Sequence, residues 1–285
     1  MCDTRAPQRG RQTIDLSLGQ VHSIIVKLYT NQLISNNNSD LLLLPSLYFL
    51  MDNDYNLPHL LEITRGEIFL KKKYNNLTIH DTLIPGFIFL ILYVIWALLV
   101  IYKNPFIHSF DQTIIHLVSN NNPTNVAIAT KLTVIGNTST LTIATIILFI
   151  GLMIAKRFAY AFFSAGLMIC ANGYNWITKH AVERHRPLVH HLVFADGYSF
   201  PSGHSVGSAT FFGILIVLTI LLVKNKSWRT ILIIIWSIFP LFIGYTRIFC
   251  HVHYPSDVIG GWLEGTTFVL LGFSVLYHLY LKKNK

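Results

Sequence analysis

Residues 243–262 read IGYTRIFCHVHYPSDVIGGW, a short polar stretch between two apolar runs. The first apolar run ends near Arg247, and the second begins at Val258. A run of about 20 apolar residues is long enough to cross a bilayer as a helix, and both runs approach that length. The stretch therefore predicts two transmembrane helices, joined by a connection with the spacing R-x5-H-x3-D that Arg247, His253 and Asp257 form.

The composition of the whole chain is typical of a membrane protein. Of the 285 residues, 52% are hydrophobic and 12% are charged, whereas about 25% of the residues of soluble domains are charged. The net charge of +9 does not indicate nucleic-acid binding, because the basic residues form short clusters between apolar runs and not one solvated face. The three cysteines, Cys2, Cys170 and Cys250, do not indicate a disulfide framework.

Six apolar runs predict an all-α fold, a bundle of six transmembrane helices. Backbone groups in the hydrocarbon have no water to bind, so each spanning run is expected to satisfy them internally as a helix. The expected helices cover about Ile84–Tyr102, Ser139–Ala155, Phe158–Thr178, Ser205–Val223, Thr230–Tyr245 and Val258–Leu281.

The basic residues between these runs predict how the bundle is oriented. One side receives eleven of them, Lys71, Lys72, Lys73, Lys156, Arg157, Lys224, Lys226, Arg229, Lys282, Lys283 and Lys285. The other side receives Lys103, Lys131 and Arg184, together with three motif residues, Lys179, Arg186 and Arg247. Because cytoplasmic loops are rich in lysine and arginine, we expect a multi-pass plasma-membrane protein with both termini in the cytoplasm and the motifs on the outer side.

The chain is expected to have two parts. Residues 1–69 are mixed in character and carry no motif, so they predict an N-terminal extension of unknown role ahead of a membrane domain at residues 70–285. A basic stretch, Leu70–Lys73, precedes the first long apolar run. We expect the functional protein to begin near this stretch, with the earlier segment dispensable or misassigned.

The segment between the first two spans, residues 104–125, is too polar to cross a membrane. Phe106, Phe110 and Ile114 recur in it at helical spacing, which predicts an amphipathic helix. Such a helix lies on the outer membrane surface or packs on the bundle.

Three basic residues predict a site for a phosphate group. The third span is followed by Lys179 and Arg186, which form the pattern K-x6-R-P with Pro187. The fifth span is followed by Arg247. Arginine contacts phosphate oxygens in pairs, and lysine supplies a point charge. A basic residue at a helix end also reaches toward lipid headgroups, but three of them beside the other motifs favour phosphate binding.

The sequence Pro201-Ser202-Gly203-His204 directly precedes the fourth span. Ser202 is a suitable N-cap, and the free N–H groups of a first helical turn attract anions. The start of this helix is therefore expected to bind an anion, and His204 to donate a proton to a leaving oxygen. The alternative interpretation is that these residues only start a helix.

The third cluster supplies a nucleophile. A neutral histidine can attack phosphorus if its other ring nitrogen holds a proton, and a carboxylate fixes that tautomer. Asp257 follows His253 by four residues, so one helical turn is expected to bring them together. His251 is the rival nucleophile but has no carboxylate at that offset. A metal site is a weaker alternative, because the carboxylates are scattered along the chain.

Taken together, these three clusters resemble the signature of the type 2 phosphatidic acid phosphatase superfamily. The resemblance covers roughly Leu83 to Leu281, and it departs from the usual Ser-Arg of the third motif at Thr246. It implies that His253 is the nucleophile, His204 the acid and Asp257 the residue that orients His253. It also implies a phosphohistidine intermediate, no metal cofactor, and one set of phosphate-binding residues, Lys179, Arg186, Ser202, Gly203 and Arg247.

The sequence thus predicts an integral membrane lipid phosphatase that cleaves a phosphomonoester or diphosphate. Its expected partners are the bilayer and a lipid phosphate, such as undecaprenyl diphosphate, phosphatidylglycerol phosphate or phosphatidate, and not nucleic acid. Two alternatives stay open: a phosphotransferase that uses the same residues, and a non-enzymatic lipid-binding or transport protein with a relict site. A haloperoxidase is not expected, because that branch of the family is soluble.

Overall fold

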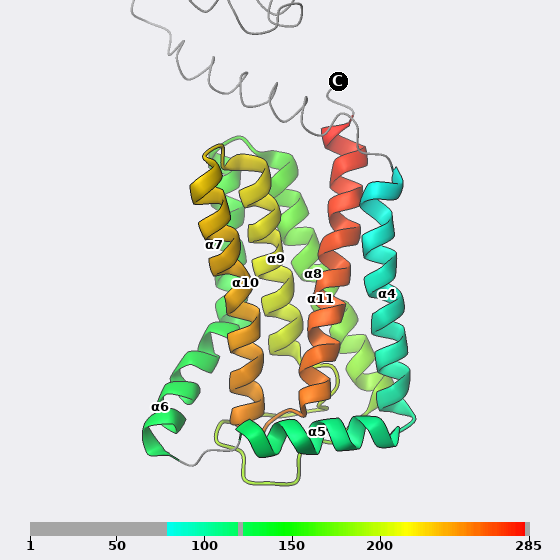
Figure 1. Ribbon diagram of the computed structural model, residues 1–285. Coiled ribbons are helices and arrows are strands. Elements are labelled where there is room, and N and C mark those ends of the chain that lie inside the picture. The colour runs from blue at the N-terminus through cyan, green and yellow to red at the C-terminus, as the bar shows by residue number, and fades with distance from the viewer. Residues whose placement is uncertain (1–78, 119–121, 283–285) are drawn as a thin grey trace, which may run out of the picture. The chain divides into compact units, whose positions relative to one another are not determined.

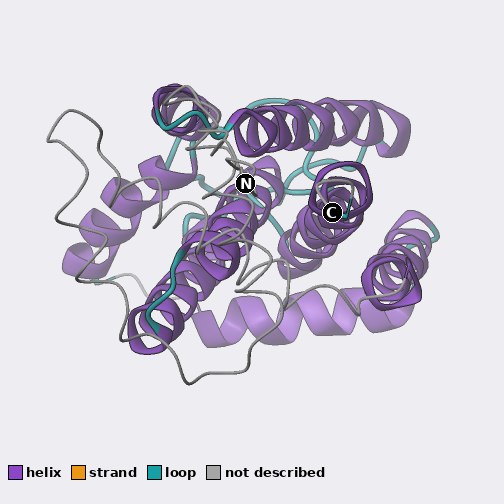
Figure 2. Ribbon diagram, turned by 90° about the horizontal axis from the view of Figure 1, so that it is seen from above, coloured by secondary structure: helices purple, strands orange, loops and turns teal. Residues whose placement is uncertain are grey.

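The computed structural model describes residues 79–118 and 122–282, and the regular structure in these residues is helical (Figures 1 and 2). The predicted extension at residues 1–69 and the basic stretch that follows it lie outside the described residues. The elements are α4 (Ile79–Ile101), α5 (Pro105–Val118), α6 (Pro123–Leu132), the 3₁₀ turn η2 (Thr133–Gly136), α7 (Thr138–Ile154), α8 (Phe158–Val182), α9 (Gly203–Leu222), α10 (Lys226–Phe249), α11 (Pro255–Leu276) and the π-helical turn η3 (Tyr277–Leu281).

Each of the six predicted spans corresponds to one helix: α4, α7, α8, α9, α10 or α11. Four helices in the described part of the chain are long and apolar enough to cross a membrane, namely His80–Ile101, Gly203–Leu222, Lys226–Phe249 and Pro255–Leu281. Helix α7 has 17 residues and, with residues 123–136, forms a pair bent by 46° that qualifies as a fifth candidate. Helix α8 carries polar residues such as Asn172 and Asn175 along its length. These helices support a multi-pass membrane protein, while the number of six spans stays a prediction.

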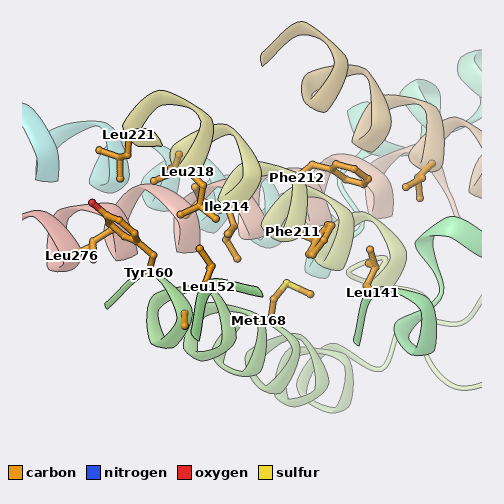
Figure 3. Close-up of a cluster of buried hydrophobic side chains, with 14 residues drawn as sticks. Leu141, Leu152, Tyr160, Met168, Phe211, Phe212, Ile214, Leu218, Leu221 and Leu276 are labelled. Carbon is orange, nitrogen blue, oxygen red and sulfur yellow. The ribbon is translucent and has the colours of Figure 1, made fainter. Parts of the chain in front are cut away.

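Helix α9 lies at the centre of the bundle. In its most apolar window 72% of the residues are buried, against 17% for α4. Its side chains Phe211, Ile214 and Leu218 meet residues of neighbouring helices, including Leu152 and Met168, in one apolar cluster (Figure 3). Apolar contact on all sides explains why the second half of this helix, from Phe211 to Leu222, is almost uniformly hydrophobic.

Helices α9 and α11 approach each other closely through glycine. A Cβ atom at Gly265 would lie 2.8 Å from the Cβ of Ala209 and 2.8 Å from the carbonyl oxygen of Val206. At Gly261 a Cβ would lie 2.8 Å from the carbonyl oxygen of Ser202. Small residues four apart allow the backbones of two helices to touch, as is common in membrane bundles.

The substitution Gly265→Ala is therefore expected to lower the stability of the protein, by about 1–3 kcal/mol as in other overpacked interiors. The added methyl group meets backbone atoms of α9, which cannot move aside like a flexible side chain. The matched control is Gly151→Ala, where a Cβ meets nothing within 4 Å and alanine favours the helix. Thermal unfolding in detergent measures the stability of both variants. Equal unfolding midpoints for the two variants would contradict the close approach of α9 and α11.

Helix α5 lies across one end of the bundle, below α4 and α11 in Figure 1. Its Asp111 is buried and accepts hydrogen bonds from the backbone N–H and the hydroxyl of Ser256, at 2.8 and 2.7 Å. Phe110 packs edge-on against Trp96 of α4, with ring centroids 5.7 Å apart. The predicted amphipathic helix therefore packs on the bundle, and it is shorter than expected because it ends at Val118.

Candidate active site

The second motif, Pro201–His204, and the third motif, which Arg247, His253 and Asp257 form, meet at the end of the bundle that α5 covers. Ser202 is the N-cap of α9, and its hydroxyl oxygen accepts a hydrogen bond from the backbone N–H of Ser205 at 3.4 Å. The backbone N–H of Ser202 donates to the carbonyl oxygen of Asp257 at 3.0 Å. The start of α9 is thus joined directly to the first turn of α11.

The hydrogen-bonding partners of His253 define its tautomer. Nη1 of Arg186 lies 3.1 Å from Nε2 of His253. A guanidinium group has donors only, so Nε2 carries the lone pair and the ring proton is on Nδ1. That nitrogen lies 3.4 Å from Oδ2 of Asp257, an ion-pair distance that lacks hydrogen-bond geometry. The arrangement leaves the lone pair of the ring on Nε2, on the side of Arg186.

The surroundings of the His253 imidazole favour its neutral form. The side chain is 2% exposed, and burial holds the pKa of His253 well below its ordinary value. The positive charges of Arg186, Lys179 and Arg247 lower this pKa further, because each disfavours a second cation nearby.

The cations of the first motif are fixed by carbonyl oxygens. Arg186 donates to the carbonyl oxygens of Val252 and Asp196, both at 2.7 Å, and of Gly197 at 3.0 Å. Lys179 donates to the carbonyl oxygen of Tyr198 at 2.7 Å. The loop between α8 and α9 therefore holds both charges in position and leaves further N–H groups of the lysine for an anion.

Arg247 approaches the site from the last turn of α10. Its side chain is buried, and Nη1 donates to the hydroxyl oxygen of Thr133 at 2.8 Å. Its Nε has no hydrogen-bonding partner among the residues that the structure describes. An unsatisfied buried donor on a charged group is costly, and a phosphate oxygen is the kind of acceptor that would satisfy it.

His204 and His251 differ in what surrounds them. Nε2 of His204, in the first turn of α9, lies 2.8 Å from the side-chain oxygen of Asn137. Nδ1 of His251, the rival nucleophile, lies 3.3 Å from the carbonyl oxygen of His190, and its backbone has a positive φ of 60°. His251 thus faces the loop between α8 and α9, whereas His253 faces Arg186 and Asp257.

Asp257 belongs to an ion-pair network that was not predicted from the sequence. Arg184 donates to Oδ1 of Asp257 at 2.6 Å and to Oδ2 of Asp111 at 2.8 Å. It also binds the hydroxyl of Ser256 at 2.7 Å, and its guanidinium lies 4.2 Å from the ring centroid of Tyr254. In the sequence, Arg184 was visible only as one more basic residue near the first motif, and Asp111 as one polar residue of an amphipathic helix.

These features define a class of protein: a helical membrane bundle with an oriented histidine and fixed cations at one end. Residues 157–281 match the model of the PAP2 superfamily. For these residues, this match confirms the resemblance inferred from the three motifs.

Individual relatives share parts of the chain. Phosphatidylglycerophosphatase B of Bacillus subtilis (strain 168) is 32% identical over 105 residues, which are 35% of this chain and 50% of that protein. An undecaprenyl-diphosphatase of Sulfolobus acidocaldarius is 37% identical over 82 residues, 27% of this chain and 34% of that protein. The chain thus spans half the length, or less, of these relatives.

A solved structure shows the same fold. It is the first transmembrane PAP2 type phosphatidylglycerolphosphate phosphatase from Bacillus subtilis, with a TM-score of 0.63 and 22% identity. The similarity covers 68% of this chain and 96% of that one. The arrangement of helices described above is therefore similar to the fold of that solved structure.

Proposed function

We propose that this protein is an integral membrane lipid phosphatase that forms a phosphohistidine intermediate. The observation that carries the proposal is the contact between Arg186 and Nε2 of His253. It leaves the lone pair on the nitrogen that faces the fixed cations, with the proton on the side of Asp257. A relict site has no physical reason to keep this tautomer.

In the first step, Nε2 of His253 attacks phosphorus and the bond from phosphorus to the lipid oxygen breaks. His204 gives a proton to that oxygen, so the lipid leaves as an alcohol or, from a diphosphate, as a monophosphate. Asp257 stabilises the charge that develops on the His253 ring. Lys179, Arg186 and Arg247 stabilise the phosphoryl oxygens, which is the main contribution that a protein makes to phosphoryl transfer.

In the second step, water attacks the phosphohistidine. His204, now neutral, takes a proton from the water, the P–N bond breaks, and His253 returns to its neutral form. Inorganic phosphate leaves. The backbone N–H group of Gly203, at the positive end of α9, favours the anion in both steps. The N–H group of Ser202, also expected to bind phosphate, donates instead to the carbonyl oxygen of Asp257.

The proposed substrate is a phosphorylated membrane lipid, and the proposed site faces outward. The positive-inside distribution of the basic residues supports an outward-facing α5 end of the bundle. There a lipid can keep its chain in the bilayer and present its phosphate to Arg247 and Lys179. The names of the relatives make phosphatidylglycerol phosphate and undecaprenyl diphosphate the first substrates to test.

The function is tested by phosphate release from these two lipids and from phosphatidate, by purified protein in detergent and excess chelator. We expect release without added metal. Analysis of the lipid products in the presence of glycerol separates hydrolysis from phosphotransfer, because a phosphotransferase would make glycerol phosphate. Folded protein that releases no phosphate from any of the three lipids would overturn the proposal.

The ordinary pKa of histidine is about 6.5, and the pKa of His253 is lowered from it. The acid limb of the pH profile of kcat/KM is therefore expected to lie below pH 6.5. Protonation of His253 stops the reaction, so a lowered pKa keeps the enzyme active to lower pH. In Arg186→Gln one neighbouring positive charge is removed, the pKa rises, and the limb is expected to move to higher pH. The profiles of both proteins, measured with one substrate, check this shift.

The control for this profile is Lys131→Gln, which removes an exposed cation of α6. It is expected to leave the limb in place. Ionisation of the substrate, with a second phosphate pKa near 6, is common to all three proteins. An unchanged limb in Arg186→Gln would contradict the role of this charge.

A further inference from the structure

The turn between η2 and α7 contacts the site in a way that the sequence motifs do not indicate. Asn137 is the N-cap of α7, yet its side chain makes no capping hydrogen bond. The side chains of the N-cap residues Asn122 and Asn225 do cap, by accepting from Thr124 and Trp228. Asn137 instead directs its side-chain oxygen to Nε2 of His204, at 2.8 Å.

The backbone of this turn is built for a close approach to His204. A Cβ at Gly136 would lie 2.5 Å from Cγ2 of the buried Ile243 and 3.1 Å from Cδ2 of His204. The same turn brings the hydroxyl of Thr133 to Arg247, at 2.8 Å. The turn therefore contacts both a proposed phosphate-binding residue and the proposed acid, although it precedes the residues that match the family model.

The chemistry of the contact sets the tautomer of His204. A side-chain carbonyl oxygen only accepts hydrogen bonds, so Nε2 of His204 carries a proton. The nitrogen that exchanges its proton is then Nδ1, which has no hydrogen-bonding partner within the described part of the chain. An acceptor at Nε2 also favours the doubly protonated ring, which the cations nearby oppose.

We propose that Asn137 is a positioning residue for His204: its amide oxygen holds the proton on Nε2, so that Nδ1 donates to the leaving oxygen. In this step the Nδ1–H bond breaks, an O–H bond forms on the departing lipid, and the ring becomes neutral with its proton still on Nε2. This inference rests on the proposed function. The two histidines thus have different partners. The carboxylate of Asp257 stabilises His253, which becomes cationic, and the uncharged amide of Asn137 holds His204, which gives up its positive charge.

An amide suits this position better than a carboxylate. A negative charge at Asn137 would repel the phosphate that Arg247 and the start of α9 are expected to bind. A negative charge would also hold the proton on His204 at the step in which that proton has to be transferred to the leaving oxygen. The neutral acceptor fixes the ring without either effect.

The test is Asn137→Ala, assayed with substrates whose leaving groups differ. With a lipid or alkyl phosphate, kcat is expected to fall about 10- to 100-fold, part of the ~10²–10⁴ that a positioned acid contributes. With p-nitrophenyl phosphate the fall is expected to be less than about 3-fold, because this leaving group departs without a proton. A structural role alone would reduce both rates equally, and that result would overturn the inference.

A double-mutant cycle gives a second measurement that does not need the aryl substrate. In the His204→Ala background, Asn137→Ala is expected to have no further effect, because the residue acts through His204. Full additivity of the two losses would overturn the inference. The matched control is Asn225→Ala, which removes a true capping side chain at α10 and is expected to leave kcat unchanged.

The outcomes separate this inference from the proposed function. If the wild-type protein releases phosphate and Asn137→Ala does so equally well, the positioning role is wrong and the phosphatase proposal is untouched. If folded wild-type protein releases none, both are overturned together.

Discussion

Replacing His253 with alanine is expected to abolish phosphate release, with a fall in kcat of at least about 10⁴-fold, as when other enzymes lose their nucleophile. The residue lies 3.1 Å from Arg186 and 3.4 Å from Asp257, and it is 2% exposed. In the proposed mechanism this imidazole makes the attack on phosphorus, so in its absence the remaining residues would bind phosphate but not accept it. Phosphate release from the lipid substrates measures the loss, and thermal unfolding shows that the variant is folded.

The matched control is His251→Asn, because asparagine tolerates the positive φ of 60° at this position. This variant is expected to keep nearly full activity. Acid quenching of the wild-type enzyme with ³²P-labelled substrate is expected to trap label on the protein, and His253→Ala is expected to trap none. Loss of activity in His251→Asn with full activity in His253→Ala would exchange the assigned roles.

Asp257→Asn is expected to lower kcat by about 10⁴-fold, as loss of the orienting carboxylate does in serine-protease triads. The amide has nearly the same shape but can present an N–H group to the ring, which favours the wrong tautomer of His253. KM is expected to change much less than kcat, because Asp257 is not expected to touch the phosphate. Steady-state kinetics in detergent separate the two constants.

The control for this variant is Asp111→Asn, which removes the other carboxylate that pairs with Arg184. If Asp257 acts on His253, the change at Asp111 is expected to cost far less activity. Equal losses in both variants would mean that Asp257 acts by holding Arg184 and the end of α5. In that case its role would be structural.

The sequence predicted the positions of the helices well, because helices depend on short-range patterns. Apolar runs and spacing within a few residues indicated α9, α10 and α11 and the pairing of His253 with Asp257. The reason given for that pairing was only partly right. Helix α11 begins at Pro255, so His253 lies ahead of the helix, and the capping turn brings the two residues together.

The contacts that the sequence did not indicate join residues far apart in the chain. Arg184 and Asp111 are 73 residues apart, and His204 and Asn137 are 67 apart. No periodicity relates such pairs, because their contact depends on how whole helices pack. Asn137 also resembles an ordinary N-cap in the sequence, and only its side-chain direction in the structure distinguishes it from Asn122 and Asn225.

Helix α11 has a consequence for how the protein is made. It packs against α4 and α9, and its Glu264 accepts a hydrogen bond from Tyr93, 171 residues earlier in the chain. Contacts of such long sequence separation form late, after the cost of closing the loop between them has been met. Asp257 arrives with this helix, so a nascent chain that has inserted α4 to α10 holds the phosphate-binding residues without the carboxylate. During synthesis the chain would be catalytically silent until its last described helix enters the membrane.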